Sequence, residues 1–374
     1  MDHLLGHATP ELVLAKRLVR RGHEVTVHAP SSLAEQVAAA GCDLVPHESV
    51  EPWIQPEGVP FMEVVGEASR HLGSPVLAEE VKRALDERRP DAAVVDVALS
   101  AGFAAAEAAK VRTACVLPLL YQPWYFWYGS ILQQVNPARA RLGLRTLPRQ
   151  TPEAVLAHVR LILVLSAAVF DFPPSRRLDR RVKYVGRMSD PDPVVWHSPW
   201  PADDRRPLVL VTLSSLFRFQ RDQVQQVLDV LGELTVRVLV LRGLTIGADT
   251  VPLPANAVGE RWVPHEAVLP EATIVVTHGG HNTVLAALEH GVPVLVSPLM
   301  REQAWNGERA EALGAGLTLE SDASRGEIHT ALDRLLADPS FSANARQAAE
   351  AFASDGGDRA VDELERLRRK RWFR

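Results

Sequence analysis

The stretch VTHGGHNTVLAALEHGVP at 276–293 combines an apolar strand, two glycines and a group of polar residues at the start of a helix. A strand that turns through glycines into a helix leaves backbone N–H groups unpaired at the helix N-terminus. Such a terminus binds anions, and phosphate is the usual one. His278, Asn282 and Thr283 can add side-chain hydrogen bonds to it. The stretch predicts a phosphate site, although a purely structural tight turn has the same glycine pattern.

A second candidate group for chemistry lies near the N-terminus. In GHATPELVLAKRLVRRGHEVTV we expect His7 in a loop, then a helix that begins at Pro10 with Thr9 as N-cap and ends at Gly22. Asp96 ends the apolar stretch PDAAVVD. In open α/β sheets ligands bind at the carboxyl ends of the strands, where Asp96 is expected to lie. Both residues also have structural explanations, as a surface loop histidine and as a helix cap.

Short β-branched runs alternate with helical patterns along nearly the whole chain. Continuous apolar runs of this kind are typical of parallel strands covered by helices on both faces. Two such sets predict an α/β protein with two Rossmann-like, doubly wound parallel-sheet domains. The predicted strands are 24–29, 92–96, 113–118, 161–166 and 182–186 in the first half, and 208–214, 236–242, 274–278, 292–298 and 316–320 in the second.

A proline-rich segment separates the two halves. Residues 188–207 contain five prolines and no regular period, so we interpret them as an extended linker. The predicted domains are therefore 1–187 and 208–357. A helical pattern over 358–374 has no strand after it, and we expect it to pack back onto the first domain.

Charge and composition exclude several classes of protein. The chain has 374 residues and a formal net charge of −5, which argues against a nucleic-acid surface. No apolar run reaches the roughly 18 residues of a membrane span, and the N-terminus lacks signal-peptide features, so we expect a cytoplasmic protein. Cys42 and Cys115 lack metal or disulfide spacing, which predicts buried, reduced thiols. The acidic pair around Pro191 lies in the linker, and no metal site is predicted.

Four motifs of the second half occur together: Trp262-Val263-Pro264, His278-Gly279-Gly280, Gly291-Val292-Pro293, and Pro298 with Glu302-Gln303 four residues later. With this combination the chain resembles the family-one, GT-B-fold glycosyltransferases, in particular the actinomycete enzymes that add sugars to natural products. The resemblance runs from about Gly6 to the end of the chain. It implies that the two domains face a cleft, with the first binding the acceptor and the second binding the nucleotide sugar.

The resemblance also implies an activity. The expected reaction is an inverting, metal-independent transfer of a sugar or deoxysugar from thymidine or uridine diphosphate to a hydroxyl of a hydrophobic aglycone, as in antibiotic biosynthesis. The nucleotide sugar is a co-substrate, and no cofactor is expected. Two alternatives stay open. One is another GT-B enzyme, such as a sugar-nucleotide 2-epimerase or a lipid-carrier transferase. The other is a catalytically impaired homologue that acts as a binding or auxiliary protein.

Residue roles follow from the same resemblance. His7 is the general base and Asp96 orients it. The nucleobase lies by Trp262 and the backbone of Val263, and the adjacent carboxylate and amide of Glu302 and Gln303 hold sugar hydroxyls. The residues implied to contact the diphosphate are Ser215, His278, Gly280, Asn282 and Thr283.

The stretch LLYQPWYFWYGS at 119–130 is dense in aromatic residues, which amphipathic periodicity does not explain. It fits a packed helix or lid as well as direct contact with a ligand. In the resembling family this region lines the acceptor pocket, which implies a hydrophobic acceptor such as a polyketide or macrolide. The residues expected to line the pocket are Trp53, Phe61, Trp124, Tyr125, Phe126 and Trp127.

One feature departs from the family pattern. Family members begin with an apolar strand before the glycine-histidine pair, whereas only MDHLL precedes Gly6 here. Loss of that strand would leave its neighbours unpaired and His7 poorly anchored. Either the true start lies upstream or the chain is a natural truncation with impaired activity, and we favour the first interpretation.

Overall fold

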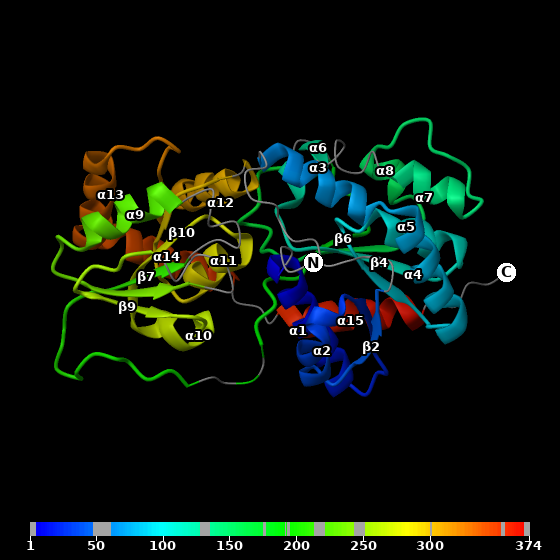
Figure 1. The fold of residues 1–374 in the computed structure, drawn as a ribbon, viewed down its shortest axis with the longest axis horizontal. Coiled ribbons are helices and arrows are strands. Elements are labelled where there is room, and N and C mark those ends of the chain that lie inside the picture. Colours follow the sequence, from blue (N-terminus) through cyan, green and yellow to red (C-terminus); the bar gives the residue numbers. More distant parts are fainter. Residues whose placement is uncertain are drawn as a thin grey trace. The chain divides into compact units, whose positions relative to one another are not determined.

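The computed structural model describes residues 5–47, 61–127, 135–174, 177–190, 192, 195–212, 221–242, 251–299, 301–352 and 356–369. They form two compact units of helices and parallel strands (Figure 1), which confirms the predicted fold class. Unit 1 comprises 1–168, 173–191 and 354–374, and unit 2 comprises 169–172 and 192–353. These boundaries differ from the predicted ones because the chain enters unit 2 briefly at 169–172 and the predicted linker is divided between the units.

The strands of unit 1 form two parallel sheets. A four-stranded sheet has the order β3-β4-β5-β6, and β1 pairs with β2. Among the described residues no pairing joins β1 to β3, so both are edge strands there. The strands are β1 (Thr26–Ala29), β2 (Asp43–Pro46), β3 (Ala93–Asp96), β4 (Thr113–Leu117), β5 (Leu161–Val164) and β6 (Val182–Tyr184).

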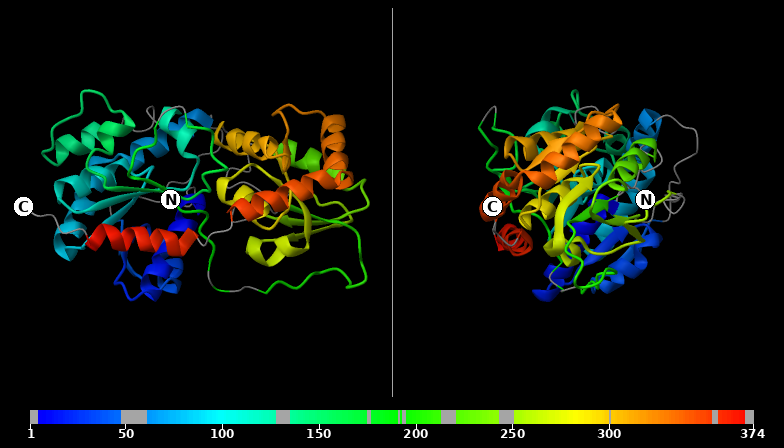
Figure 2. Two further views of the ribbon diagram at one scale, coloured as in Figure 1. Left: turned by 180° about the vertical axis from the view of Figure 1, so that it is seen from behind. Right: turned by 90° about the vertical axis from the view of Figure 1, so that its left-hand side faces the viewer.

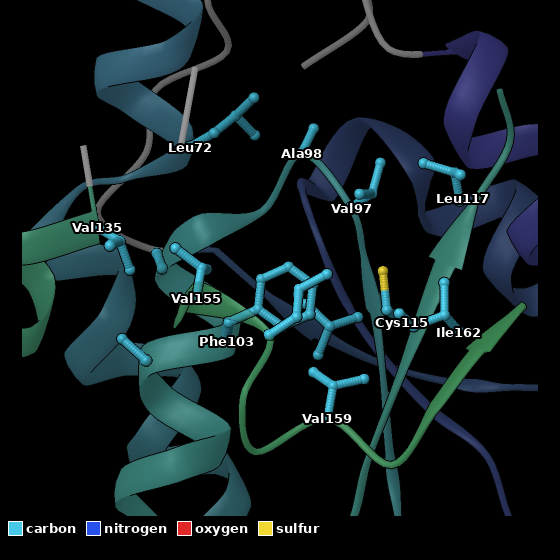
Figure 3. Packing of buried hydrophobic residues seen from close by; sticks show 14 of the residues in the cluster. Leu72, Val97, Ala98, Phe103, Cys115, Leu117, Val135, Val155, Val159 and Ile162 are labelled. Carbon is cyan, nitrogen blue, oxygen red and sulfur yellow. The ribbon is translucent and has the colours of Figure 1, made fainter. Parts of the chain in front are cut away.

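Helices cover these strands through an apolar core. Figure 3 shows the Phe103 ring among side chains that come from the sheet, including Cys115 and Ile162. Helix α5 approaches β3 closely, since a Cβ on Gly102 would lie 2.9 Å from the Val95 side chain. The helices are α1 (Leu5–Arg20), α2 (Ala34–Ala39), α3 (Phe61–Leu72), α4 (Pro75–Arg88), α5 (Ser100–Ala108), α6 (Tyr121–Trp127), α7 (Val135–Arg141), α8 (Pro152–Val155) and α15 (Gly356–Arg369).

Helix α1 corrects the predicted start of the first helix. It begins by Leu5, so His7 is helical and Pro10 lies inside the helix instead of opening it. The proline ring fixes φ near the helical value, and its missing N–H costs one hydrogen bond to the carbonyl of Gly6. That loss is tolerated here, one turn from the first described residue of the helix.

The C-terminal helix α15 lies alongside α1 (Figures 1 and 2). Val361 and Leu364 of α15 are buried in one apolar cluster with Val13 and Leu14 of α1. Polar contacts flank this cluster, including one of 3.1 Å between His23 Nε2 and Glu365 Oε1. The last helix of the chain therefore belongs to the hydrophobic core of the first unit.

Unit 2 contains one parallel sheet of six strands in the order β12-β11-β10-β7-β8-β9. Its strands are β7 (Leu208–Thr212), β8 (Arg237–Leu241), β9 (Ala257–Glu260), β10 (Ala272–Thr277), β11 (Val294–Val296) and β12 (Gly316–Thr318). Its helices are α9 (Arg221–Leu231), α10 (His265–Val268), α11 (His281–Glu289), α12 (Arg301–Ala312), α13 (Arg325–Ala337) and α14 (Pro339–Phe352). Within the described ranges, no helix is both long and apolar enough to cross a bilayer.

Candidate functional site

The strand order of unit 2 identifies one place in its sheet where a ligand is expected. The chain builds outward from β7 through β8 to β9, then returns to the other side of β7 with β10 and continues to β12. The order reverses between β7 and β10, where Thr212 lies opposite Thr277. In open α/β sheets, ligands bind beyond the carboxyl ends of the strands at such a switch point. The predicted phosphate site follows β10 directly, at this position.

The loop between β10 and α11 has the backbone geometry of a helix terminus that is open to a ligand. Gly279 has φ +89°, and a Cβ there would lie 2.7 Å from both the Gln303 carbonyl oxygen and the Val296 side chain. Gly280 caps α11 without a side-chain hydrogen bond to the helix N–H groups. Asn282 and Thr283 in the first turn are half-buried. The terminus thus presents backbone donors beside two polar side chains, which suits an anion.

A buried amide supports this loop from α12. Asn306 donates from Nδ2 to the Gly279 carbonyl at 2.8 Å, and its Oδ1 accepts from Nδ1 of His281 at 2.9 Å. Neither residue was predicted from the sequence. Their positions in the sequence could have identified them: His281 is the first residue of the predicted helix, and Asn306 lies one helical turn after Glu302. Asn306 connects the carbonyl before the helix to the first residue of the helix and so fixes the glycine turn.

His278 is neutral at physiological pH. Burial, followed by repulsion from His265, lowers the pKa of its imidazole to about 4. Its Nδ1 is buried and has no hydrogen-bond partner among the residues that the structure describes. Its Nε2 lies over Gly280, 2.7 Å from the position of a Cβ on that glycine. A neutral imidazole carries one N–H, so His278 can donate a single hydrogen bond to an anion at this terminus.

The other predicted donor-binding residues occupy different environments. Trp262 is 68% exposed, so its ring is open to stack on a flat ligand, and Val263 next to it is half-buried. Gln303 is buried, and its Oε1 accepts from the Leu299 backbone at 2.8 Å, so part of its amide already supports the loop before α12. Glu302 is half-buried on the same helix. Ser215 lies outside the described residues.

In unit 1, the structure brings together the predicted pair His7 and Asp96. His7 Nδ1 and Asp96 Oδ2 are 2.9 Å apart, although the two residues come from α1 and from the end of β3. The other carboxylate oxygen of Asp96 accepts from the Ala98 backbone at 2.7 Å. Burial opposes ionisation of Asp96, but His7 and the hydrogen bonds to the carboxylate outweigh it and lower its pKa. Nδ1–H therefore donates to a carboxylate, and Nε2 becomes the proton-accepting nitrogen. The hydrogen bond to Asp96 holds the His7 ring in place.

Within the aromatic stretch, the structure places Trp124 in the core of unit 1 and not in a pocket wall. Trp124 is only 2% exposed and belongs to the core of unit 1 together with Tyr121, so the packed-helix interpretation holds for it. Tyr125 is half-buried against the same cluster, and its ring centroid lies 6.5 Å from that of Trp124. Large aromatic side chains are buried preferentially when a core can enclose them. Trp53 and the side chains of Phe61, Phe126 and Trp127 lie outside the described residues.

Comparisons with known sequences connect the chain to glycosyltransferases. Residues 225–366 match the family described as Erythromycin biosynthesis protein CIII-like, C-terminal domain. NDP-glycosyltransferase YjiC of Bacillus subtilis (strain 168) is 26% identical over 377 residues, covering 98% of this chain and 95% of the relative. The 4'-demethylrebeccamycin synthase of Lentzea aerocolonigenes is 30% identical over 243 residues, covering 64% of this chain and 57% of that protein.

Comparisons with solved structures identify the fold. The glycotransferase of kitacinnamycin superposes with a TM-score of 0.76 at 22% identity, covering 96% of this chain and 95% of that one. Glycosyltransferase VinC in complex with DTDP gives 0.72 at 21% identity, covering 97% and 96%. Spinosyn rhamnosyltransferase SpnG complexed with spinosyn aglycone gives 0.67 at 20% identity, covering 96% of each chain. The two units therefore have the GT-B fold.

We expect Gly279→Ala to destabilise the protein, because the left-handed φ and the two close contacts leave no room for a methyl group. The free energy of unfolding should fall by about 1–3 kcal/mol, measured by urea denaturation. Gly326→Ala is the control, since a Cβ there would meet nothing within 4 Å. Equal stability of the two variants would contradict the geometry of the glycine turn.

The low pKa of His278 predicts an acid-sensitive contribution to stability. Between pH 6.5, the ordinary pKa of a histidine, and pH 4, His278 binds a proton in the unfolded chain but stays neutral in the folded protein. This contribution therefore falls as the pH drops through that range. His278→Gln should lose less unfolding free energy than the unmodified protein between pH 7 and pH 5, because the glutamine side chain does not titrate. An identical loss in the two proteins would refute the assignment.

Proposed function

We propose that this chain transfers a sugar from a nucleoside diphosphate to a hydroxyl of a hydrophobic natural product. The chain is a GT-B glycosyltransferase of the Erythromycin biosynthesis protein CIII-like family. It is related to actinomycete natural-product glycosyltransferases and to YjiC. The transfer inverts the anomeric carbon and uses no metal. One observation carries the proposal: the hydrogen bond between His7 and Asp96, which prepares an imidazole to accept a proton.

In this mechanism unit 1 removes the proton from the acceptor. Nε2 of His7 takes the hydroxyl proton as the acceptor oxygen forms its bond to the anomeric carbon. The ionised carboxylate of Asp96 stabilises the imidazolium that results, since opposite charges at hydrogen-bond distance favour each other. The bond between the anomeric carbon and the diphosphate breaks in the same displacement, and attack from the opposite side inverts the configuration.

Unit 2 holds the leaving group in this proposal. The diphosphate accepts hydrogen bonds from the backbone at Gly280, from Asn282 and Thr283, and from neutral His278. Fixed dipoles at a helix N-terminus stabilise charge that develops on a leaving oxygen, an effect worth about 3–4 kcal/mol per well-placed donor in enzymes. The exposed ring of Trp262 stacks on the nucleobase beside Val263, and Glu302 and Gln303 hold the sugar hydroxyls.

Thymidine diphosphate is the first donor nucleotide to test, and uridine diphosphate is the second. Glycosyltransferase VinC forms a complex with DTDP, and spinosyn rhamnosyltransferase SpnG forms one with spinosyn aglycone. These ligands, carried over to this chain, support a deoxysugar donor and an apolar acceptor. Trp124 lies in the core, so we propose that other aromatic residues of the same helix contact the acceptor. Tyr125, which is half-buried, is one of them.

A nucleotide panel measured by thermal shift tests donor binding. At one hundred times its dissociation constant a ligand stabilises the folded state by about 2.7 kcal/mol, so thymidine or uridine diphosphate should raise the melting temperature clearly. Thymidine and uridine, which lack the diphosphate, serve as controls. The proposed donor site is wrong if the diphosphates stabilise no more than the nucleosides do.

His7→Ala should lower the rate of sugar transfer by about 10²–10⁴-fold, because the acceptor then loses its general base. Donor affinity should stay within about twofold, since the proposed nucleotide site is built from unit 2 and the change removes only proton transfer. His23→Ala is the matched control, because His23 in unit 1 also contacts a carboxylate, Glu365, and has no proposed role. Unchanged turnover of His7→Ala would remove His7 from the mechanism.

The unmodified protein also separates the alternative functions. If it binds the donor without transferring sugar, an auxiliary role is favoured. If it inverts a centre of the sugar without any acceptor, an epimerase is favoured.

A further inference from the structure

A second carboxyl group accompanies the His7–Asp96 pair. Glu11 lies on α1 one helical turn after His7, a spacing that places both side chains on the same face of the helix. Its carboxyl group is hydrogen-bonded to the carboxyl group of Asp96, and its Oε1 is buried without a hydrogen-bond partner. Among the described residues, the Asp96 carboxyl group therefore has three partners: the His7 ring, the Ala98 backbone and Glu11.

Two carboxyl groups can form a hydrogen bond only if one of them carries a proton. His7 and the Ala98 N–H both donate to Asp96, which favours the anion there. Glu11 has no such donors on its buried oxygen. Burial, followed by repulsion from Asp96, raises the pKa of Glu11 well above its ordinary value. The shared proton therefore belongs to Glu11, which donates it to the Asp96 carboxylate.

Water has limited access to these carboxyl groups, since the Asp96 side chain is 13% exposed and Glu11 is half-buried; Cys115 is a buried neighbour in the sheet. It lies on β4 opposite Val95, the residue before Asp96, and its side chain is fully buried. Burial, and then the negative charges of Asp96 and Glu11, raise the pKa of its thiol, whereas Arg181 opposes this effect. In such surroundings an unpaired carboxylate is costly, so a carboxylic acid donor next to Asp96 stabilises the arrangement.

We propose that Glu11 is a positioning residue of the transfer reaction, a permanently protonated acid that fixes the Asp96 carboxylate against His7. This inference rests on the proposed role of His7 as the general base. Glu11 exchanges no proton with the substrate. The acceptor proton moves to Nε2 of His7, Asp96 stays ionised, and Glu11 keeps its own proton throughout. By sharing the charge of Asp96, Glu11 also moderates the basicity that the carboxylate confers on the imidazole.

Two substitutions separate this role from simple packing. Glu11→Gln keeps a donor, because the amide N–H can bond to Asp96, whereas Glu11→Met keeps the volume and removes the donor. We expect Glu11→Gln to retain transfer within about threefold and Glu11→Met to lose about 10–100-fold in kcat, with the KM for the donor unchanged. Without the donated hydrogen bond the charge of Asp96 is concentrated on His7. The acid limb of the kcat profile should then move upward by about half to one pH unit in Glu11→Met alone.

An NMR titration of the His7 ring tests the same point without any substrate. Its midpoint should rise in Glu11→Met and stay in place in Glu11→Gln and in Glu35→Met, a control on the exposed face of α2. Infrared spectra of the unmodified protein at pH 7 should show a protonated carboxyl band that Glu11→Gln lacks. An ionised Glu11, or the same His7 midpoint in all variants, would overturn the inference. If the titrations behave as expected but His7→Ala still transfers sugar, the network stands and the proposed function fails.

Discussion

Parallel strand pairing is the constraint from which both candidate sites follow. Each parallel pair needs a crossover, so the carboxyl ends of successive strands meet at one edge of their sheet. Asp96 ends β3 in unit 1, and the glycine turn follows the end of β10 in unit 2. In both cases a helix completes the site. Helix α1 carries His7, which contacts Asp96, and helix α11 presents its N-terminus after the glycine turn. The chemistry therefore depends on short loops held between buried strands and helices.

The histidine proposed as the base and the histidine proposed to bind the diphosphate have opposite surroundings. His7 contacts an ionised carboxylate, which favours a protonated ring once a proton arrives. His278 is buried beside another histidine, which keeps its ring neutral. The first environment suits a base that must hold a proton for part of the reaction. The second suits a donor that binds an anion without exchanging protons with it.

Much of this organisation could be predicted from the sequence because buried parallel strands are continuous apolar runs. All ten predicted strands occur, most of them shorter at one or both ends. The two unpredicted strands, β2 and β9, lie at sheet edges, and their sequences DLVP and AVGE contain proline, glycine and charged residues in place of an apolar run. The start of α1 was predicted wrongly because proline usually opens a helix. The sequence could not decide between a packed helix and a pocket wall for Trp124, and it did not indicate the contact between Glu11 and Asp96, since both depend on which neighbours tertiary packing brings together.

The path of the chain limits how the two units can be recombined with those of related enzymes. The chain leaves unit 1 at 168, returns at 173, leaves again after 191, and ends with α15 packed on α1. A chimera that exchanges the first half alone would place a foreign α1 against the original α15 and mismatch their apolar faces. Exchange of unit 1 between related enzymes therefore requires that the last helix be exchanged together with the first half of the chain. Apart from the short passage through unit 2 at 169–172, the crossover points lie near 191 and near 354.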